Sequence, residues 1–326
     1  MYGIWWIVFE SDTRSLASVE LGLLITKYSP MYRAHTRYTF SMALTDTEIK
    51  TIEEKAEAIR ETILDMLVEA KSGHTAGPLG MADLFAAFYF HILTHDPKNP
   101  DWVDRDRLIL SNGHTVPVRY ATMAHAGYFP IEECLTLRKF GSRLQGHPER
   151  NRLPGLETTS GPLGSGLSQA AGIALGLRMD GKKNRTFVMM SDGEQQEGNI
   201  WEAVMFAAKY ELGNLTAVMD RNNIQIDGMT EDVMPLDSLK EKYEAFGWHV
   251  LEVDGHNIEA FVDACDHAKA IPEKPTLIIA HTIPGKGVPE IEYDYRWHGK
   301  PPTKEEAARF MKELRNGAGR VPHEYA

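Results

Sequence analysis

Cysteine is scarce in this chain of 326 residues, which contains only Cys134 and Cys265. The two residues have neither the close spacing of a metal site nor the framework of a small secreted protein, so we expect buried, reduced thiols. Long apolar runs are missing too, and no stretch approaches the length of a membrane span. These absences argue against a disulfide scaffold and a transmembrane protein, and they favour a cytoplasmic one.

Positive charge is also in short supply. The chain has 35 Lys and Arg residues against 46 Asp and Glu residues, and its net charge is −11. Nucleic acids and anionic membrane surfaces both require a basic field, so neither is an expected partner. The 13 histidines, by contrast, are numerous, and several lie in segments rich in glycine and proline. An anionic ligand would have to be met by locally placed His, Lys or Arg side chains.

Segments with helical periodicity alternate with short apolar, β-branched runs from Asp46 onward. Asp46 is a suitable N-cap for the first helix, and Gly73 follows its end. Helices are predicted at 46–71, 81–93, 116–126, 167–179, 199–211, 236–246, 258–269 and 304–314, and strands at 108–110, 186–190, 215–219, 250–253 and 276–281. This alternation predicts an α/β fold, a doubly wound and mainly parallel sheet with helices on both faces. The long loop at 140–166 is expected to be functional.

Two of the predicted strands end in polar segments. Ser191-Asp192-Gly193-Glu194 follows one strand, Asp220-Arg221-Asn222-Asn223-Ile224 follows the next, and a helix lies between them. In such a βαβ unit both strand ends reach the same edge of the sheet, where doubly wound folds bind ligands. A carboxylate and an amide oxygen suit a hard divalent cation that also binds diphosphate and water. Two ordinary turns explain the same residue types, and the spacing alone does not decide between these interpretations.

Other segments favour the ligand site. The two strand ends resemble the thiamine diphosphate signature, with Ser191 in place of its first glycine. Four further segments are similar, in the same order, to the N-terminal third of transketolase: Ser72 to Met81, Leu110 to His114, Gln145 to Pro148 and Thr159 to Gly164. The resemblance covers roughly residues 43–300. It implies the diphosphate-binding domain of the thiamine diphosphate-binding fold.

The resemblance also implies the cofactor and its ligands. Mg²⁺ or Ca²⁺ would be held by Asp192, Asn222 and the carbonyl of Ile224, and Gly193 would let the backbone approach the diphosphate. The remaining positions that match cofactor-binding residues of the family are Gly161 and Leu163, at the two rings, and His114 and His298.

Four histidines match active-site positions of the family. His74 and His298 are the candidates for proton transfer, because imidazole can both donate and accept a proton near neutrality. His147 is expected to bind the terminal hydroxyl of the donor, and His114 the cofactor diphosphate or the substrate. Glu197 matches a glutamate that links the two active sites of the dimer; as an acid near a helix N-terminus, it has a structural explanation as well.

The resemblance implies a transferase that moves a two-carbon ketol unit from a ketose phosphate to an aldose phosphate, as in the pentose phosphate pathway. The chain matches only the first part of transketolase. We therefore expect the N-terminal subunit of a split enzyme, active as an α₂β₂ heterotetramer with a pyrimidine-binding subunit. Two alternatives stay open: the α subunit of another split thiamine enzyme, such as a 2-oxo acid dehydrogenase E1, and a non-catalytic regulatory subunit.

Residues 1–42 resemble no part of the family. A start codon assigned too early, with Met42 as the true beginning, is the preferred explanation, and a lineage-specific extension or a transit peptide is the alternative. The chain is accordingly divided into an extension at 1–42 and a transketolase-like domain with a C-terminal tail at 43–326.

Overall fold

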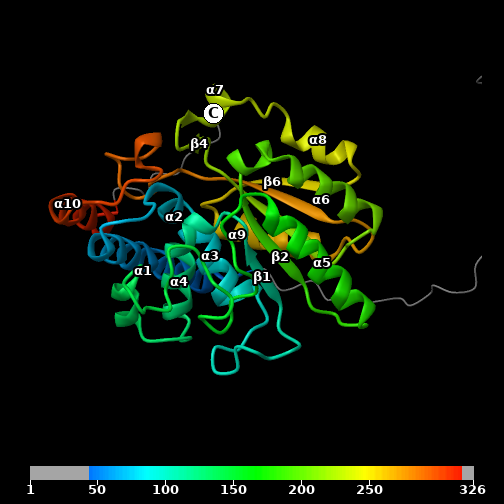
Figure 1. Ribbon diagram of the computed structural model, residues 1–326, viewed down its shortest axis with the longest axis horizontal. Helices are drawn as coiled ribbons and strands as arrows, with labels where there is room; N and C mark the ends of the chain where they lie inside the picture. The colour runs from blue at the N-terminus through cyan, green and yellow to red at the C-terminus, as the bar shows by residue number, and fades with distance from the viewer. Residues whose placement is uncertain (1–43, 318–326) are drawn as a thin grey trace, which may run out of the picture. The chain divides into compact units, whose positions relative to one another are not determined.

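A parallel sheet forms the centre of the computed structural model, which describes residues 44–317 (Figure 1). Its strands are β1 (Arg107–Leu110), β2 (Thr186–Ser191), β3 (Leu215–Arg221), β6 (His249–Asp254) and β7 (Thr276–His281). Their order in the sheet is β1-β2-β3-β7-β6, and every neighbouring pair is parallel. The predicted α/β fold with a doubly wound parallel sheet is therefore confirmed.

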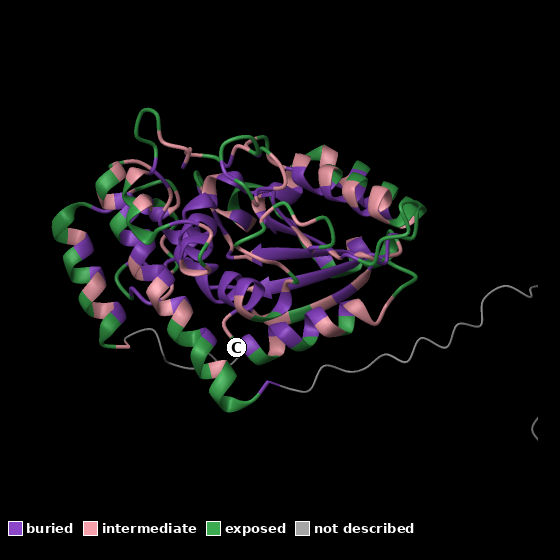
Figure 2. Ribbon diagram, turned by 90° about the horizontal axis from the view of Figure 1, so that it is seen from below, coloured by how far each residue is buried: buried purple, intermediate pink, exposed green. Residues whose placement is uncertain are grey.

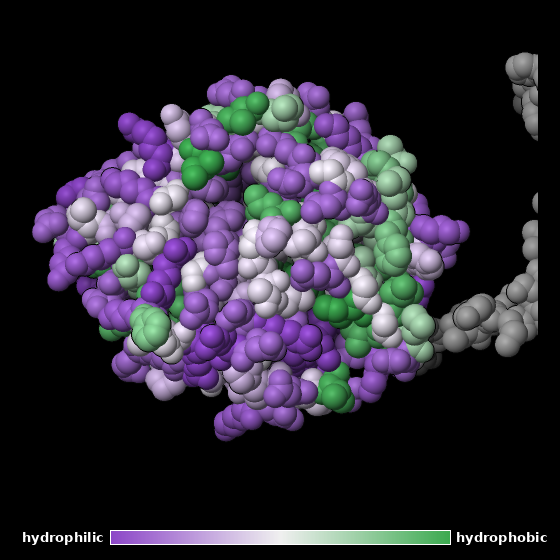
Figure 3. Space-filling view, viewed as in Figure 1, coloured by the Kyte–Doolittle hydropathy of each residue, from purple (hydrophilic) through white to green (hydrophobic). Residues whose placement is uncertain are grey.

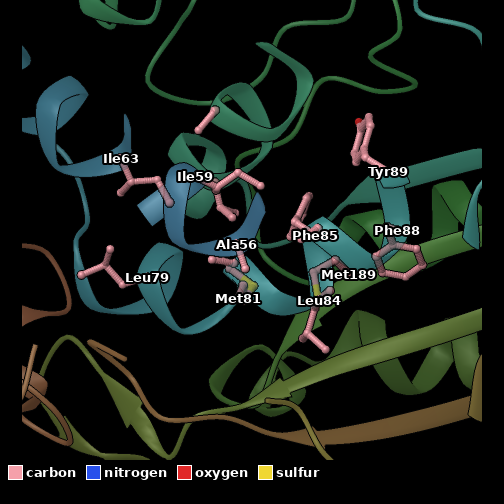
Figure 4. Close-up of a cluster of buried hydrophobic side chains, with 14 of the residues drawn as sticks. Ala56, Ile59, Ile63, Leu79, Met81, Leu84, Phe85, Phe88, Tyr89 and Met189 are labelled. Atoms are coloured by element: carbon pink, nitrogen blue, oxygen red, sulfur yellow. The ribbon is translucent and has the colours of Figure 1, made fainter. Parts of the chain in front are cut away.

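The first face of the sheet is covered by α1 (Asp46–Ala70), α3 (Ala82–Ala87), α4 (Val116–His125) and α9 (Ile258–Lys269). Side chains alternate between the faces of a strand, and Phe187 and Met189 of β2 point toward these helices. Figure 4 shows Met189 beside Phe85 and Phe88, with Ala56 and other α1 side chains in the same cluster. All of these side chains are fully buried.

The opposite face is covered by α5 (Ser165–Met179), α6 (Gly198–Lys209) and α8 (Leu239–Ala245). Val188 and Met190, the alternate residues of β2, pack here, so both faces of the strand are apolar. Figure 2 shows buried strands between helices whose outer sides are exposed. Helices cover both faces of the sheet, which leaves the carboxyl ends of the strands as the place where such a fold binds ligands.

The first helices depart from the predictions in two ways. The N-cap of α1 is Thr45 rather than Asp46, because Thr45 Oγ1 accepts from Glu48 N and Glu48 Oε2 accepts from Thr45 N in a capping box. The predicted helix at 81–93 is divided into α3 and a π-helical turn, Phe88–Ile92, and is preceded by the short α2 (Ala76–Gly80). An unbroken apolar run does not distinguish α from π hydrogen bonding.

The bounds of the other predicted helices and strands agree with the structure within a few residues. The predicted long loop is present, because the described residues between the 3₁₀ helix Ile131–Thr136 and α5 form no helix or strand. Elements that were not predicted are the hairpin of β4 (Ile224–Gln225) and β5 (Gly228–Met229) and the short α7 (Thr230–Val233). The last helix, α10 (Lys304–Arg315), ends one residue beyond its predicted end.

Two expectations from composition can be examined directly. Both cysteines are free and buried, and burial raises the pKa of each thiol to about 12. Among residues 44–317, no helix has the combined length and apolar character that crossing a bilayer requires. The predictions for residues 1–42 lie outside the described residues.

Candidate active site

The ends of β2 and β3 lie side by side at the carboxyl edge of the sheet. Ser191 is in register with Asp220, and the backbone N–H of Asn223 donates to Asp192 Oδ2 at 2.7 Å. Asn222 precedes Asn223 in the chain, and it is 5 % exposed. The topology therefore brings the predicted carboxylate and amide to one place, as a βαβ unit requires.

Asp192 is completely buried, and its two oxygens have different partners. Oδ2 accepts hydrogen bonds from Arg221 Nη1 at 3.0 Å and from Thr230 Oγ1 at 3.3 Å, in addition to Asn223 N. Among the described residues, Oδ1 accepts only from the N–H of Gly193, at 2.7 Å. Burial raises the pKa of Asp192, and the Arg221 guanidinium opposes that shift. Oδ1 is the oxygen with spare acceptor capacity for a further ligand.

The orientation of the Asn222 amide is set by its neighbours. Its Nδ2 donates to Asp220 Oδ2 at 2.6 Å, and its Oδ1 accepts from Ile224 N at 3.0 Å. Asp220 also accepts from the Thr282 hydroxyl, and burial raises its pKa to about 7. Within the described residues no cluster of three or more His, Cys, Asp or Glu could hold a metal. A cation bound to Asp192 and Asn222 would thus need oxygens from a ligand or water as well.

Three of the predicted histidines form a cluster. The ring centroid of His74 lies 4.7 Å from that of His114 and 5.4 Å from that of His298, and the His114 and His298 centroids are 5.1 Å apart. His74 Nδ1 is buried and has no hydrogen-bond partner within the part of the chain that the structure describes. Buried polar atoms are rarely left without a hydrogen bond in folded proteins, so this nitrogen is available to bind a ligand.

Burial lowers the pKa of all three clustered rings, which favours their neutral form. Burial lowers the pKa of His74 to about 3, with repulsion from His298, Arg138 and His147 adding to the effect. The pKa of His114 falls well below 6.5 for the same main reason, and burial lowers the pKa of His298. Partial burial and repulsion from Arg138 lower the pKa of His147, which is more exposed than the three clustered histidines. Neutral imidazoles can accept a proton, as general bases must.

Hydrogen bonds between loops hold the histidines in place. Thr75 Oγ1, next to His74, donates to the carbonyl oxygen of Lys300 at 2.5 Å. Arg138 donates to Ser72 Oγ at 3.2 Å and to the carbonyl of Gly146, beside His147, at 3.4 Å. A Cβ built on Gly299 would lie 3.8 Å from His74 Nε2 and 4.0 Å from Ile226 Cδ1. Gly299 thus lies between His74 and the hairpin that follows Asn222.

The glycines of the candidate site border open space. A Cβ on Gly161 would meet no atom of residues 44–317 within 4 Å, and one on Gly193 would meet only the Gln225 side chain there, at 3.6 Å and beyond. Leu163 is partly buried, and its carbonyl accepts from Asn199 Nδ2 at 3.3 Å. The protein itself leaves room at both glycines, which is the room that a bound ligand would use.

Glu197 stands apart from this group. It is the N-cap residue of α6, it is exposed, and its side chain makes no capping hydrogen bond to the described backbone. The structural explanation, an acid at a helix N-terminus, is compatible with this position.

Sequence reasoning missed several residues that shape the site: Ser111, Arg138, Glu194, Asp220 and Arg221. Four of them lie within the segments that resemble transketolase, and this position could have indicated that they belong to the site. Arg138 lies in none of those segments, and only the folded chain shows its contacts.

Comparison with known proteins identifies similar chains. The model of the transketolase thiamine diphosphate-binding domain matches residues 51–324. The chain is 42% identical over 263 residues to the 6-deoxy-6-sulfo-D-fructose transketolase subunit SqwG of Clostridium sp. (strain MSTE9), covering 81% of this chain and 96% of that one. It is 39% identical over 267 residues to one of the subunits of the apulose-4-phosphate transketolase of Phocaeicola vulgatus, covering 82% and 95%.

A solved structure agrees with these matches. The transketolase from Leishmania mexicana superposes with a TM-score of 0.76 at 35% identity, covering 81% of this chain and 41% of that one. The chain thus spans nearly the whole length of the two subunit relatives and less than half of the longer transketolase. The matches favour transketolase over the 2-oxo acid dehydrogenase alternative.

Proposed function

Because this chain belongs to the transketolase family, as the thiamine diphosphate-binding subunit of a split enzyme, we propose that it transfers two-carbon ketol units only together with a pyrimidine-binding subunit. The observation that carries this proposal is the cluster of His74, His114 and His298, with Gly299 lying between His74 and Ile226 of the hairpin that follows Asn222. A regulatory subunit would have no need to keep this combination.

The residues at the strand edge fit a metal-bound diphosphate. Asp192 Oδ1, the Asn222 amide oxygen and the Ile224 carbonyl would hold Mg²⁺ or Ca²⁺, since hard cations take oxygen ligands. Gly193 leaves space for the diphosphate and Gly161 for the rings, where Leu163 supplies an apolar contact. Thiamine diphosphate, when bound, supplies the carbanion chemistry that breaks and forms the carbon–carbon bond.

The histidines would then handle the substrate protons. A neutral His74 or His298 accepts the proton of a donor hydroxyl as the carbon–carbon bond breaks and returns it to the new ketose. His298 would also contact the cofactor, and His114 would bind the diphosphate or the substrate. His147, which is exposed and near enough to lower the pKa of His74, would bind the terminal hydroxyl of the donor. Glu197, exposed in this chain, is available to connect two active sites in an assembly.

An exposed apolar surface supports the need for a partner. Figure 3 shows apolar side chains over α5 and α6, and Met179, Met205, Phe206 and Tyr210 are exposed there. Apolar patches rimmed by polar residues mark interaction sites. We assign this face to the contact with the pyrimidine-binding subunit in an α₂β₂ complex.

The substrates are proposed to be sugar phosphates or close analogues. The relatives are named for a sulfonated fructose and for apulose 4-phosphate, so the family accepts varied ketoses. The general reaction takes a ketose phosphate and an aldose phosphate, as in the pentose phosphate pathway, in the cytoplasm.

Reconstitution tests the proposal. The chain is purified alone and mixed with its cognate second subunit, and sedimentation and a coupled ketose-to-aldose assay are run on both samples with thiamine diphosphate and Mg²⁺. The mixture should sediment as α₂β₂ and transfer two-carbon units, whereas the chain alone should transfer none. Robust transfer by the isolated chain would refute the split-subunit proposal.

A further inference from the structure

Glu194 is a fully buried carboxylate with three hydrogen-bond donors. Its Oε1 accepts from Gly164 N at 2.5 Å and from the Ser111 hydroxyl, and its Oε2 accepts from Ser191 N at 3.1 Å. Ser111 Oγ in turn accepts from Gly166 N at 3.1 Å. The donors of this group are all satisfied, which is what a buried polar network needs to be stable.

The three donors come from segments that are far apart in the sequence. Ser111 follows β1, Gly164 ends the long loop that contains Gly161 and Leu163, and Ser191 is the last residue of β2, immediately before Asp192. The Glu194 side chain therefore links the end of β2, where the cation is proposed to bind, to the loop proposed to contact the cofactor rings.

Glu194 makes these contacts without a basic neighbour among the described residues. Burial raises its pKa, and the hydrogen bonds from Ser111, Gly164 and Ser191 oppose that shift because they stabilise the carboxylate. In that part of the chain no Lys, Arg or His forms an ion pair with it, and the charge that acts on it, Glu197, is negative. Burying an isolated carboxylate is costly, so its retention calls for a specific role of its hydrogen bonds.

Tight packing gives the joint its rigidity. Gly164 has a φ of 82°, and a Cβ there would lie 1.8 Å from Asn199 Oδ1. A Cβ on Gly166 would lie 2.4 Å from the Ser111 side chain. The loop can approach β1 and α6 this closely only with glycine, and Glu194 supplies the acceptor that fixes it there.

We propose that Glu194 is a positioning residue that couples the strand end at Asp192 to the loop at Gly161 and Leu163. The segment that binds the diphosphate of thiamine diphosphate and the segment that binds its rings are thereby held in a fixed relative position. The inference rests on the proposed function. It assigns to Glu194 the alignment of two binding segments and no contact with substrate or cofactor.

Glu194→Gln tests the coupling. Glutamine keeps the shape of the side chain, but its NH₂ group cannot accept a hydrogen bond. This group must face either Ser191 N–H or the pair of donors Gly164 N–H and Ser111 O–H, so the hydrogen bonds on that side are lost. Asp106→Asn is the matched control, because Asp106 also joins two segments, by accepting from Thr94 N at 2.9 Å and Arg185 N at 2.8 Å, at the opposite edge of the sheet.

The readout is the Kd of thiamine diphosphate in the presence of Mg²⁺, measured by tryptophan fluorescence on the assembled two-subunit protein, with the KM of the donor ketose and the Tm alongside. Both variants should lower Tm. Only Glu194→Gln should raise the cofactor Kd, by at least about tenfold or about 1.4 kcal/mol, with the donor KM unchanged at saturating cofactor.

An unchanged cofactor Kd in Glu194→Gln, or an equal rise in Asp106→Asn, would overturn the inference. Absence of cofactor binding by the wild-type complex would instead overturn the proposed function. If Glu194→Gln does not fold, Ser111→Ala removes a single donor and keeps the carboxylate; it should raise the Kd about threefold, and a wild-type Kd there would contradict the coupling.

Discussion

Asn222 and Asp220 are joined by a hydrogen bond of 2.6 Å from the amide Nδ2 to the carboxylate Oδ2. The bond identifies the nitrogen side of the amide and leaves the carbonyl oxygen on the side of the Ile224 N–H. Asp220 is not among the proposed ligands of the cation. It would act on the proposed metal site through the orientation of Asn222, as residues behind metal ligands commonly do.

Removing this partner should weaken metal binding. We expect Asp220→Ala to reduce Mg²⁺ affinity about 10- to 100-fold, the usual effect of losing a hydrogen-bond partner behind a ligand. Asp220→Asn, whose amide oxygen can still accept from Asn222, should lose less. A Mg²⁺ titration of thiamine diphosphate binding measures both, and equal affinities for Asp220→Ala and wild type would contradict the assignment.

Asp192→Ala should abolish thiamine diphosphate-dependent activity of the assembled complex. The diphosphate charge has to be neutralised by a cation, and this substitution removes the carboxylate among its proposed ligands. Arg221 keeps its ion pair with Glu231 at 2.5 Å, so the fold should remain intact. Circular dichroism and calorimetry check the fold, and wild-type cofactor affinity in this variant would refute the site.

The stability of the protein should fall as pH decreases below about 6.5, the pKa of an unfolded histidine. His74, His114 and His298 have lowered pKa values in the folded state, so below pH 6.5 the unfolded chain binds more protons than the folded one. Each can contribute up to about 1.4 kcal/mol per pH unit. The loss should continue toward pH 3 for His74, whose folded pKa is about 3.

Urea unfolding of the wild type and of His74→Asn between pH 7.5 and 5 measures this slope. His74→Asn should show a shallower decline, because one depressed titration is gone. Identical slopes in the two proteins would contradict a lowered pKa for His74.

Assembly should depend on the face of α5 and α6. Phe206→Glu places a charge on a side chain that is 38% exposed there and should prevent formation of the α₂β₂ complex without lowering the Tm of the isolated chain by more than a few degrees. Val103→Glu, at a position that is 63% exposed before β1, should assemble normally. Sedimentation velocity distinguishes the two, and full assembly of Phe206→Glu would rule this face out.

A chain that begins at Met42 should fold and assemble like the full-length protein. The motivation is that α1 carries its own capping box at Thr45 and Glu48 and thus has a complete start. Thermal unfolding and partner binding of the shortened chain provide the measurement. A large drop in Tm or a failure to bind the partner would show that residues 1–42 belong to the functional protein.

The secondary structure was largely predictable where the local pattern and the final contacts agree. The helix Ile258–Lys269 and the strand Thr276–His281 have their predicted bounds because apolar periodicity and clear end signals coincide there. The π-helical turn at Phe88–Ile92 and the hairpin at Ile224–Met229 were not predictable, since backbone hydrogen bonding in such short segments is decided by the surrounding packing.

The sequence by itself determined the chemical types at the site, namely the carboxylate and amide at two strand ends, the glycines and the histidines, because these residues lie in short segments of recognisable spacing. The βαβ pattern also predicted that the two strand ends meet, but only the tertiary structure decided that His74, His114 and His298 form a cluster. The neutral state of His74 depends on rings and charges more than 30 positions away, and the joint at Glu194 unites Ser111, Gly164 and Ser191. Burial and long-range hydrogen bonds belong to the folded chain, and no local pattern encodes them.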